Sequence, residues 1–181
     1  MMVIGVLALQ GGFSEHIQML RGLGAAAREI RQPADWAAGG LDGLVIPGGE
    51  STVMGKLLVE LELMEPIRAA IAAGLPVFGT CAGLILLARF LGLGAGVRRN
   101  AYGRQLGSFA TEADFAGRGA IPMVFIRAPY IESTSQGVEV LSVVDGHIVA
   151  ARQKNILATS FHPELTGSPV VHEYFLDMVA A

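Results

Sequence analysis

The first half of the chain alternates short apolar runs with segments whose apolar positions recur at helical spacing. The runs with the length of buried strands lie at residues 2–9, 25–30, 41–49 and 75–79. Between or after them, helical segments are expected at residues 14–23, from Ser51 onward, at 65–74 and at 84–91. This order predicts an α/β protein with a doubly wound, mostly parallel sheet and helices on both faces.

From about Gly96 the pattern changes to shorter strands and turns. The segment "VVDGHI", residues 143–148, carries the Asp-Gly dipeptide of a tight hairpin. Residues 155–161 return to a buried strand, and residues 168–181 predict a C-terminal helix. Because no linker or internal repeat divides the chain, we expect one domain over residues 1–181 with hairpins added in its second half.

Composition supports a sheet that is buried on both faces, since 52% of the residues are hydrophobic and 16% are charged. The net charge is −3 and the basic residues are scattered, which argues against nucleic acid or an anionic membrane as a partner. Residues 69–88 carry no charge, but a proline and three glycines break this stretch into core elements. The single cysteine and the absence of a basic signal-peptide start favour the reducing cytoplasm.

The only cysteine, Cys81, lies in "GTCAG", residues 79–83, where a predicted strand meets a predicted helix. This segment fits a G-x-nucleophile-x-G elbow, whose glycines permit a sharp turn. A helix N-terminus stabilises a thiolate, and ligands of open α/β sheets bind at the carboxyl ends of strands. Cys81 is therefore a candidate nucleophile, with a buried inert thiol as the alternative.

A cysteine nucleophile needs a histidine base that a third group orients. His16 and His172 fall in the first and last predicted helices, where solvated or packing roles are expected, so that replacing His172 by alanine should affect the chemistry little. His147 follows the hairpin turn and is expected to be exposed. His162 directly follows the buried strand at 155–161, which places it at the carboxyl edge of the sheet.

Glu164 is the candidate for the third group. Pro163 biases His162 towards an extended backbone, in which residues i and i+2 point the same way, about 6–7 Å apart. The Glu164 carboxylate can then reach one imidazole nitrogen while the other nitrogen faces the thiol of Cys81. A loop histidine beside a surface glutamate is the alternative for this segment.

A second glycine turn, "PGGES" at residues 47–51, ends another predicted strand. Its backbone amides could donate to an oxyanion or to a substrate carboxylate. We expect Ser51 or Thr52 to cap the helix that follows, which is compatible with substrate contact. Glu50 could recognise an ammonium group, and a solvated glutamate is the alternative.

Cys81 in "GTCAG", His162 and Glu164 in "FHPE", and "PGGES" together resemble the class I (triad) glutamine amidotransferases. The blocks "GVLALQGGFSEH", "RNAYGRQ", "FIRAP" and "SFHPELT" are similar to the glutaminase subunit of pyridoxal 5′-phosphate synthase, the PdxT family, and span almost the whole chain. The resemblance implies a flavodoxin-like fold with Cys81 as nucleophile, His162 as general base and acid, and Glu164 as the orienting carboxylate.

The same resemblance implies the remaining site residues. It assigns glutamine binding to Gly49, Glu50, Ser51, Arg99, Ile126 and Arg127. It assigns the oxyanion hole to the amides of Ala82 and of Gly48 or Gly49, and an interface with the synthase subunit to Gln10 and Gly11. No cofactor is required. Residues 91–97 form a shorter stretch than is usual in the family, so the shape of the rim of the site is not implied by the resemblance.

The implied activity is hydrolysis of L-glutamine to L-glutamate and ammonia, with delivery of ammonia to the synthase subunit for pyridoxal 5′-phosphate (vitamin B6) synthesis. A glutaminase of another synthase, such as the imidazole glycerol phosphate enzyme, should lack "RNAYGRQ" and "FIRAP". A non-catalytic regulatory binder would not need the whole Cys-His-Glu set. A stress-response cysteine protein of similar fold should lack the His-Pro-Glu segment.

Overall fold

The computed structural model describes residues 1–99 and 108–181. Five parallel strands form the first part of its main sheet: β1 (Val3–Leu7), β2 (Ala26–Ile30), β3 (Gly43–Ile46), β4 (Val77–Thr80) and β11 (Ile156–Thr159). Their order across the sheet is β2-β1-β3-β4-β11. This is the flavodoxin-like order, and it confirms the predicted doubly wound fold.

Antiparallel strands extend the sheet beyond β11. They are β5 (Ala95–Arg98), β8 (Tyr130–Thr134), β9 (Glu139–Val144) and β10 (His147–Gln153), while β6 (Ser108–Asp114) and β7 (Ala120–Ile126) pair separately. At the β9–β10 turn, Asp145 and Gly146 have φ values of 49° and 78°. Two successive positive φ values are what a type I′ hairpin needs, so the hairpin predicted from the Asp-Gly dipeptide is confirmed.

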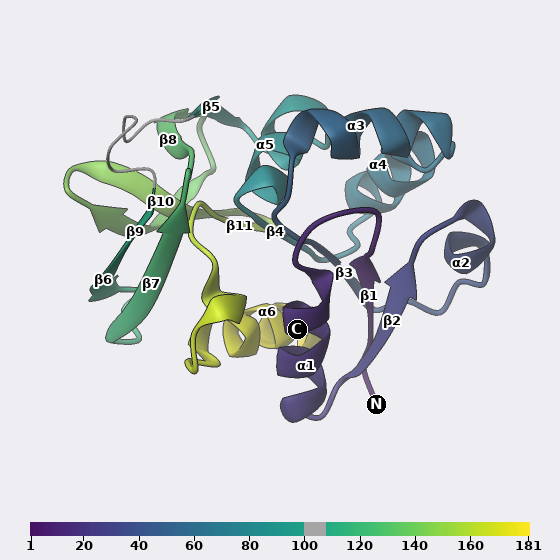
Figure 1. Cartoon of the computed structure of the whole chain (residues 1–181), viewed down its shortest axis with the longest axis horizontal. Coiled ribbons are helices and arrows are strands. Elements are labelled where there is room, and N and C mark those ends of the chain that lie inside the picture. The colour runs from purple at the N-terminus through teal and green to yellow at the C-terminus, as the bar shows by residue number, and fades with distance from the viewer. Residues whose placement is uncertain (100–107) are drawn as a thin grey trace.

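Helices cover both faces of the parallel strands (Figure 1). One face carries α1 (Phe13–Gly22) and α6 (Val170–Ala180), and the other carries α3 (Ser51–Glu60), α4 (Met64–Ala72) and α5 (Ala82–Phe90). Every residue of β3, β4 and β11 is buried. Because both faces of these strands are covered, their sequences are continuous apolar runs rather than alternating ones.

Two helix starts differ from the sequence predictions. Between the strands predicted at residues 25–30 and 41–49, where no helix is predicted, the structure has a short helix, α2 (Pro33–Ala37), with proline in its first turn. The N-cap of α3 is Glu50 and not Ser51 or Thr52, because Glu50 has an extended backbone and its carboxylate accepts the N–H groups of Thr52 and Val53 at 3.3 and 3.0 Å. Ser51 is already helical and buried, so its hydroxyl is not the cap.

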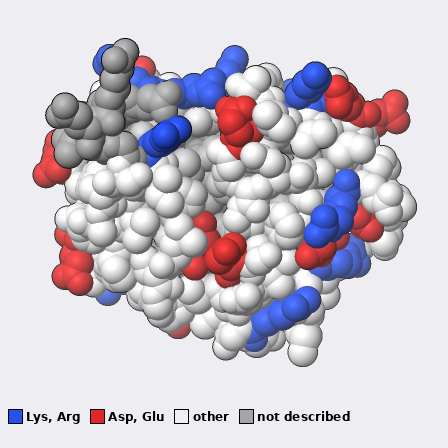
Figure 2. Space-filling model, in the orientation of Figure 1, with Lys and Arg blue, Asp and Glu red and all other residues white. Residues whose placement is uncertain are grey.

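The uncharged stretch at residues 69–88 is divided among α4, β4 and α5, as the glycines and the proline predict. Within the described ranges, we find no helix with both the length and the apolar character needed to cross a membrane. On the face shown in Figure 2, acidic and basic side chains are interspersed rather than gathered by sign. His147, which the sequence predicts to be exposed, is half-buried and stacks on Tyr130 with ring centroids 4.1 Å apart.

Candidate active site

The loops that follow β1, β3, β4 and β11 enclose a cavity of about 540 Å³ at the carboxyl edge of the sheet. Open α/β sheets bind ligands at this edge. The structure brings together every residue predicted for the triad, the oxyanion hole and glutamine binding, and these residues line the cavity: Gly48, Gly49, Glu50, Ser51, Cys81, Ala82, Arg99, Ile126, Arg127, His162 and Glu164. Gln10 lies behind this lining, where its Oε1 accepts the backbone N–H of Glu50 at 2.7 Å.

Gly11 holds the β1 loop against the β3 loop. A Cβ atom at Gly11 would lie 1.8 Å from the carbonyl oxygen of Gly48, so only glycine permits this approach of the two backbones. The neighbouring Gly12 N–H donates to the same carbonyl at 3.4 Å. The two residues predicted for the partner interface, Gln10 and Gly11, are therefore both in direct contact with the loop at residues 48–50.

Cys81 forms the turn between β4 and α5 with φ 52° and ψ −103°. A positive φ is strained for a residue that carries a Cβ atom, and such strain is typical of a nucleophile elbow. The backbone N–H of Cys81 donates to the carbonyl oxygen of Thr159 at 2.8 Å and anchors the turn on β11. The Sγ atom lies 4.0 Å from the carbonyl oxygen of Ile126, and Cys81 is only 8% exposed.

His162 and Glu164 follow β11 and form the hydrogen bond that their spacing predicts. His162 Nδ1 lies 2.8 Å from Glu164 Oε2. An ionised carboxylate only accepts, so Nδ1 carries the hydrogen and Nε2 is left to exchange a proton with the Cys81 sulfur. The backbone N–H of His162 donates to the carbonyl oxygen of Val124 at 2.8 Å, which fixes the start of the loop.

The charge on His162 depends on its two neighbours. Burial by itself lowers the pKa of His162, whereas hydrogen bonds to Cys81 and Glu164, together with the negative charges of both groups, raise it. The net effect raises the pKa of His162 from 6.5 to about 10. At neutral pH the imidazole therefore holds a proton beside the sulfur, an arrangement that suits a cysteine nucleophile and a general acid.

Backbone amides surround the position next to the sulfur. Ala82 is the first residue of α5, whose leading N–H groups have no acceptor within the helix and lie at its positive end. Gly48 packs under the imidazole, where a Cβ atom would lie 2.4 Å from Cε1 of His162. Gly48 and Ala82 both line the cavity that contains Cys81, where amides can donate to an oxyanion.

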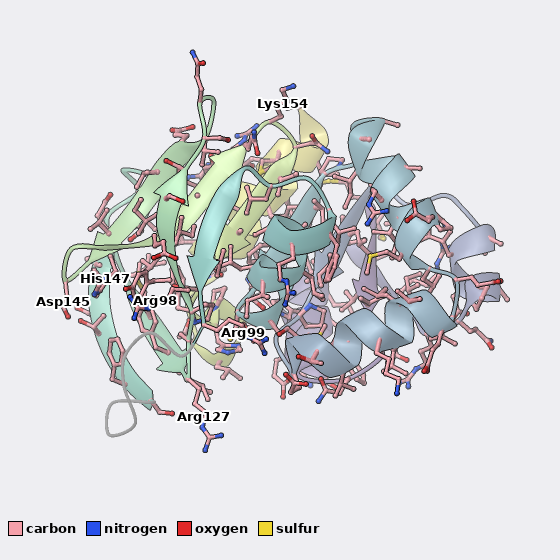
Figure 3. All side chains as sticks on the ribbon, turned by 90° about the horizontal axis from the view of Figure 1, so that it is seen from above. Arg98, Arg99, Arg127, Asp145, His147 and Lys154 are labelled. Atoms are coloured by element: carbon pink, nitrogen blue, oxygen red, sulfur yellow. The ribbon has the colours of Figure 1, made fainter. Side chains whose placement is uncertain are left out.

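Charged side chains lie at the rim of the cavity. Arg99 Nη2 lies 3.4 Å from Glu50 Oε1, and both side chains are partly exposed, at 43% and 49%. Arg127 is exposed with φ 45°, and Figure 3 shows it extending away from the ribbon on the same side of the molecule as Arg99. The other residues of "RNAYGRQ", 100–105, lie outside the described residues.

Comparison with known proteins identifies the family of this chain. The SNO glutamine amidotransferase family matches residues 6–181 of the chain. The chain belongs to this family. The "Pyridoxal 5'-phosphate synthase subunit PdxT" of Haemophilus influenzae (strain PittGG) is 54% identical, with 98% of each chain covered. The protein of the same name from Streptococcus pneumoniae (strain CGSP14) is 55% identical, with 98% of this chain and 97% of the relative covered.

Solved structures agree with the assignment to the SNO glutamine amidotransferase family. A crystal structure described as a glutamine amidotransferase matches with a TM-score of 0.92 and 43% identity, covering 98% of this chain and 99% of the other. The crystal structure of a putative GMP synthase protein from Thermoplasma acidophilum matches with a TM-score of 0.75, and at 20% identity it shows the fold alone. The family resemblance inferred from the sequence motifs is therefore confirmed.

This family member contains a buried histidine pair that sequence reasoning missed. His16 and His172 are fully buried, and His16 Nδ1 lies 2.8 Å from His172 Nε2. Of the two roles expected for them, the solvated role is wrong and the packing role agrees with their burial. A signal was present in the sequence, because His16 precedes Ile17 on the apolar face of α1 and His172 lies three residues before Phe175 on the apolar face of α6. Glu15, next to His16, also lines the cavity and was not predicted.

Proposed function

We propose that this chain is the glutaminase subunit of a pyridoxal 5′-phosphate synthase, acting as one domain over residues 1–181. It hydrolyses L-glutamine to L-glutamate and ammonia and delivers the ammonia to the synthase subunit. The observation that carries the proposal is the position of Cys81, strained at φ 52° in the same cavity as the hydrogen-bonded His162 and Glu164. The names of the PdxT relatives support the choice of synthase.

The chemistry follows from the roles of these groups. The Cys81 thiolate attacks the side-chain carboxamide carbon of glutamine, and the amides of Ala82 and of Gly48 or Gly49 donate to the oxyanion that forms. The C–N bond then breaks as His162 gives its proton to the departing nitrogen, so that ammonia leaves and a γ-glutamyl thioester remains. His162 next takes a proton from water, which attacks the thioester and releases glutamate and the sulfur.

The rim supplies charges that complement an amino acid. The guanidinium groups of Arg99 and Arg127 suit the α-carboxylate, and the Glu50 carboxylate suits the α-ammonium. Gly49, Ser51 and Ile126 complete the contacts with glutamine. Because Glu50 is held both as the cap of α3 and by Arg99, its carboxylate is oriented before substrate arrives.

The partner is expected at the β1 loop. Ammonia released into water is mostly protonated, so its use in synthesis needs a closed path to the synthase subunit. Gln10 and Gly11 are proposed as contacts with that subunit. Gln10 accepts the N–H of Glu50 at 2.7 Å, which gives a docked partner a direct contact with the glutamine-binding loop. A thiolate enzyme with one cysteine fits the reducing cytoplasm, where we place the reaction.

The test measures glutamate release from glutamine with and without purified pyridoxal 5′-phosphate synthase subunit. We expect hydrolysis by the complex, and we expect Cys81→Ala to abolish it while co-purification with the synthase subunit continues. Ser142→Ala is the matched control, because it removes a buried side-chain hydrogen bond to Asp114 away from the cavity. Undiminished hydrolysis in Cys81→Ala, or activity only with an imidazole glycerol phosphate synthase subunit, would contradict the proposal.

A further inference from the structure

Behind the triad lies a buried polar cluster that the proposed mechanism does not use. It consists of His16 on α1, His172 on α6 and Thr80 at the end of β4, and all three residues are fully buried. His16 Nε2 lies 3.3 Å from Thr80 Oγ1 and 3.6 Å from Glu164 Oε1. The cluster therefore includes Thr80, the residue before the nucleophile, and contacts the carboxylate that orients the base.

The protonation pattern of the two histidines follows from their contacts. Nδ1 of His172 is buried and has no hydrogen-bond partner among the described residues. A buried N–H without an acceptor is costly, so the hydrogen of neutral His172 resides on Nε2. His172 Nε2 then donates to His16 Nδ1, and His16 must carry its own hydrogen on Nε2, the atom that faces Thr80 and Glu164.

Glu164 needs such a donor. Its side chain is 1% exposed, and Oε2 is engaged by His162. Oε1 has no hydrogen-bond partner in the part of the chain that the structure describes, and His16 Nε2 lies 3.6 Å from it. This separation is longer than a hydrogen bond, so the contact between the Nε2–H group and the carboxylate oxygen is electrostatic, while the same N–H lies within hydrogen-bond distance of Thr80 Oγ1.

The histidine pair acts without a charge of its own. Burial, followed by repulsion from His172 and His162, lowers the pKa of His16 well below its usual range. Burial likewise lowers the pKa of His172 to about 4. Neutral His16 can therefore hold Glu164 without neutralising it, and the full negative charge of the carboxylate remains available to the imidazolium of His162.

We propose that His16 and His172 are positioning residues of the triad. His172 fixes the tautomer of His16, and the Nε2–H group of His16 holds Glu164 against His162 and supports Thr80 beneath the Cys81 elbow. The inference rests on the proposed glutaminase function. It also assigns a role to His172, which the sequence alone suggests is dispensable for the chemistry.

The test compares His16→Leu, His16→Gln and His16→Asn. In the complex with the synthase subunit, kcat and KM for glutamine are measured. The second readout is the rate of Cys81 alkylation by iodoacetamide as a function of pH, which reports on one thiol because the chain has one cysteine. Glutamine can place its amide nitrogen where Nε2 of histidine lies, whereas asparagine reaches only the Nδ1 position, so the two amides differ in reach alone.

We expect His16→Leu to lower kcat by about 10- to 100-fold, the range found when the outer partners that orient metal-binding side chains are removed, with KM little changed. The acid limb of its alkylation profile should move to higher pH, because Glu164 then supports the imidazolium of His162 less well. His16→Gln should recover most of the activity and the profile, and His16→Asn should not. His172→Leu should lose less than His16→Leu, because it removes only the control of the tautomer.

The variant Leu176→Ala distinguishes a purely structural role of the histidine pair from a positioning role. It truncates a buried side chain one helical turn from His172. This variant should unfold at a lower temperature but keep the alkylation profile of the wild type. Equal activities of His16→Gln and His16→Asn, or a Leu176→Ala profile shifted like that of His16→Leu, would overturn the inference. If the wild type does not hydrolyse glutamine, the proposed function fails, while the alkylation profiles still decide whether His16 positions the triad.

Discussion

The strongest test of the site's electrostatics is the substitution Glu164→Gln. Glutamine has the size of glutamate and keeps an oxygen that can accept the Nδ1–H of His162, so the hydrogen bond of 2.8 Å can persist. The substitution removes the negative charge. The charge of Glu164 is one of the causes that raise the pKa of His162 to about 10 against the opposing effect of burial.

The expected fall in the pKa of His162 follows from the geometry of the His162–Glu164 pair. An imidazolium and a carboxylate in this contact have charge centres about 4 Å apart, and at an effective dielectric constant of about 20 they attract by about 4 kcal/mol. Solvent screens the pair little, because the side chains of His162 and Glu164 are 11% and 1% exposed. Loss of about 4 kcal/mol weakens protonation of His162 about a thousand-fold, so its pKa falls from about 10 to near neutrality and the imidazole is no longer fully protonated at neutral pH.

The assay is kcat/KM for glutamine together with the alkylation rate of Cys81, each measured from acid to alkaline pH. Wild-type protein should keep His162 protonated until the pH rises through about 10. In Glu164→Gln we expect kcat/KM at neutral pH to fall by about 100-fold or more and the acid limb of alkylation to move to higher pH. Glu164→Asp, which keeps the charge but shortens its reach, should lie between. Wild-type values in Glu164→Gln would refute the reasoning.

Three further expectations concern the rim, the loop and the pH dependence of stability. Gly48→Ala would place a Cβ atom 2.4 Å from Cε1 of His162, so glutamine hydrolysis should be lost while circular dichroism stays native; full activity would contradict this contact. Arg99→Met removes the ion pair between the partly exposed side chains of Arg99 and Glu50, which is worth at most about 1 kcal/mol, so the melting temperature should hardly change. KM for glutamine should rise, because Arg99 is proposed to bind the α-carboxylate. The pKa of His172 is lowered to about 4, so unfolding takes up a proton between about pH 4 and 6.5. Stability should therefore fall as the pH drops through this range, and His172→Leu should flatten that decline in melting temperature.

Sequence patterns predicted the parallel half of the sheet because strands that are buried on both faces are short, largely apolar runs, which are easy to locate in a sequence. Strands β3, β4 and β11 contain only buried residues, and a glycine or proline follows the end of each within four residues: Pro47, Gly83 and Pro163. The triad was predictable for a similar reason. Cys81 has its own local turn signature, and His162 and Glu164 are two residues apart, so a short extended segment brings them together.

The features that the sequence did not reveal depend on contacts between distant segments. His16 and His172 are 156 residues apart, and only the packing of α1 beside α6 against β4 brings them together. Each is a polar residue in an amphipathic helix, where polarity favours a solvated position and only the helical register indicates burial. The Glu50 cap was missed for a different reason, because serine and threonine are the commoner caps and lie next to it in the sequence.

Three unfavourable features of the described residues lie along one line of contacts that ends at the sulfur. A strained φ at Cys81 opposes folding, and so do an oxygen of buried Glu164 and a nitrogen of buried His172 that have no hydrogen-bond partner within residues 1–99 and 108–181. All three lie on or directly behind the carboxyl edge of the sheet, where the apolar strands and the two helix layers hold the surrounding backbone in place. The Glu50 cap and the His16–His172 pair, both missed by local sequence patterns, belong to this site or contact it. An unexplained buried histidine next to such an edge is therefore best interpreted through the site that it touches.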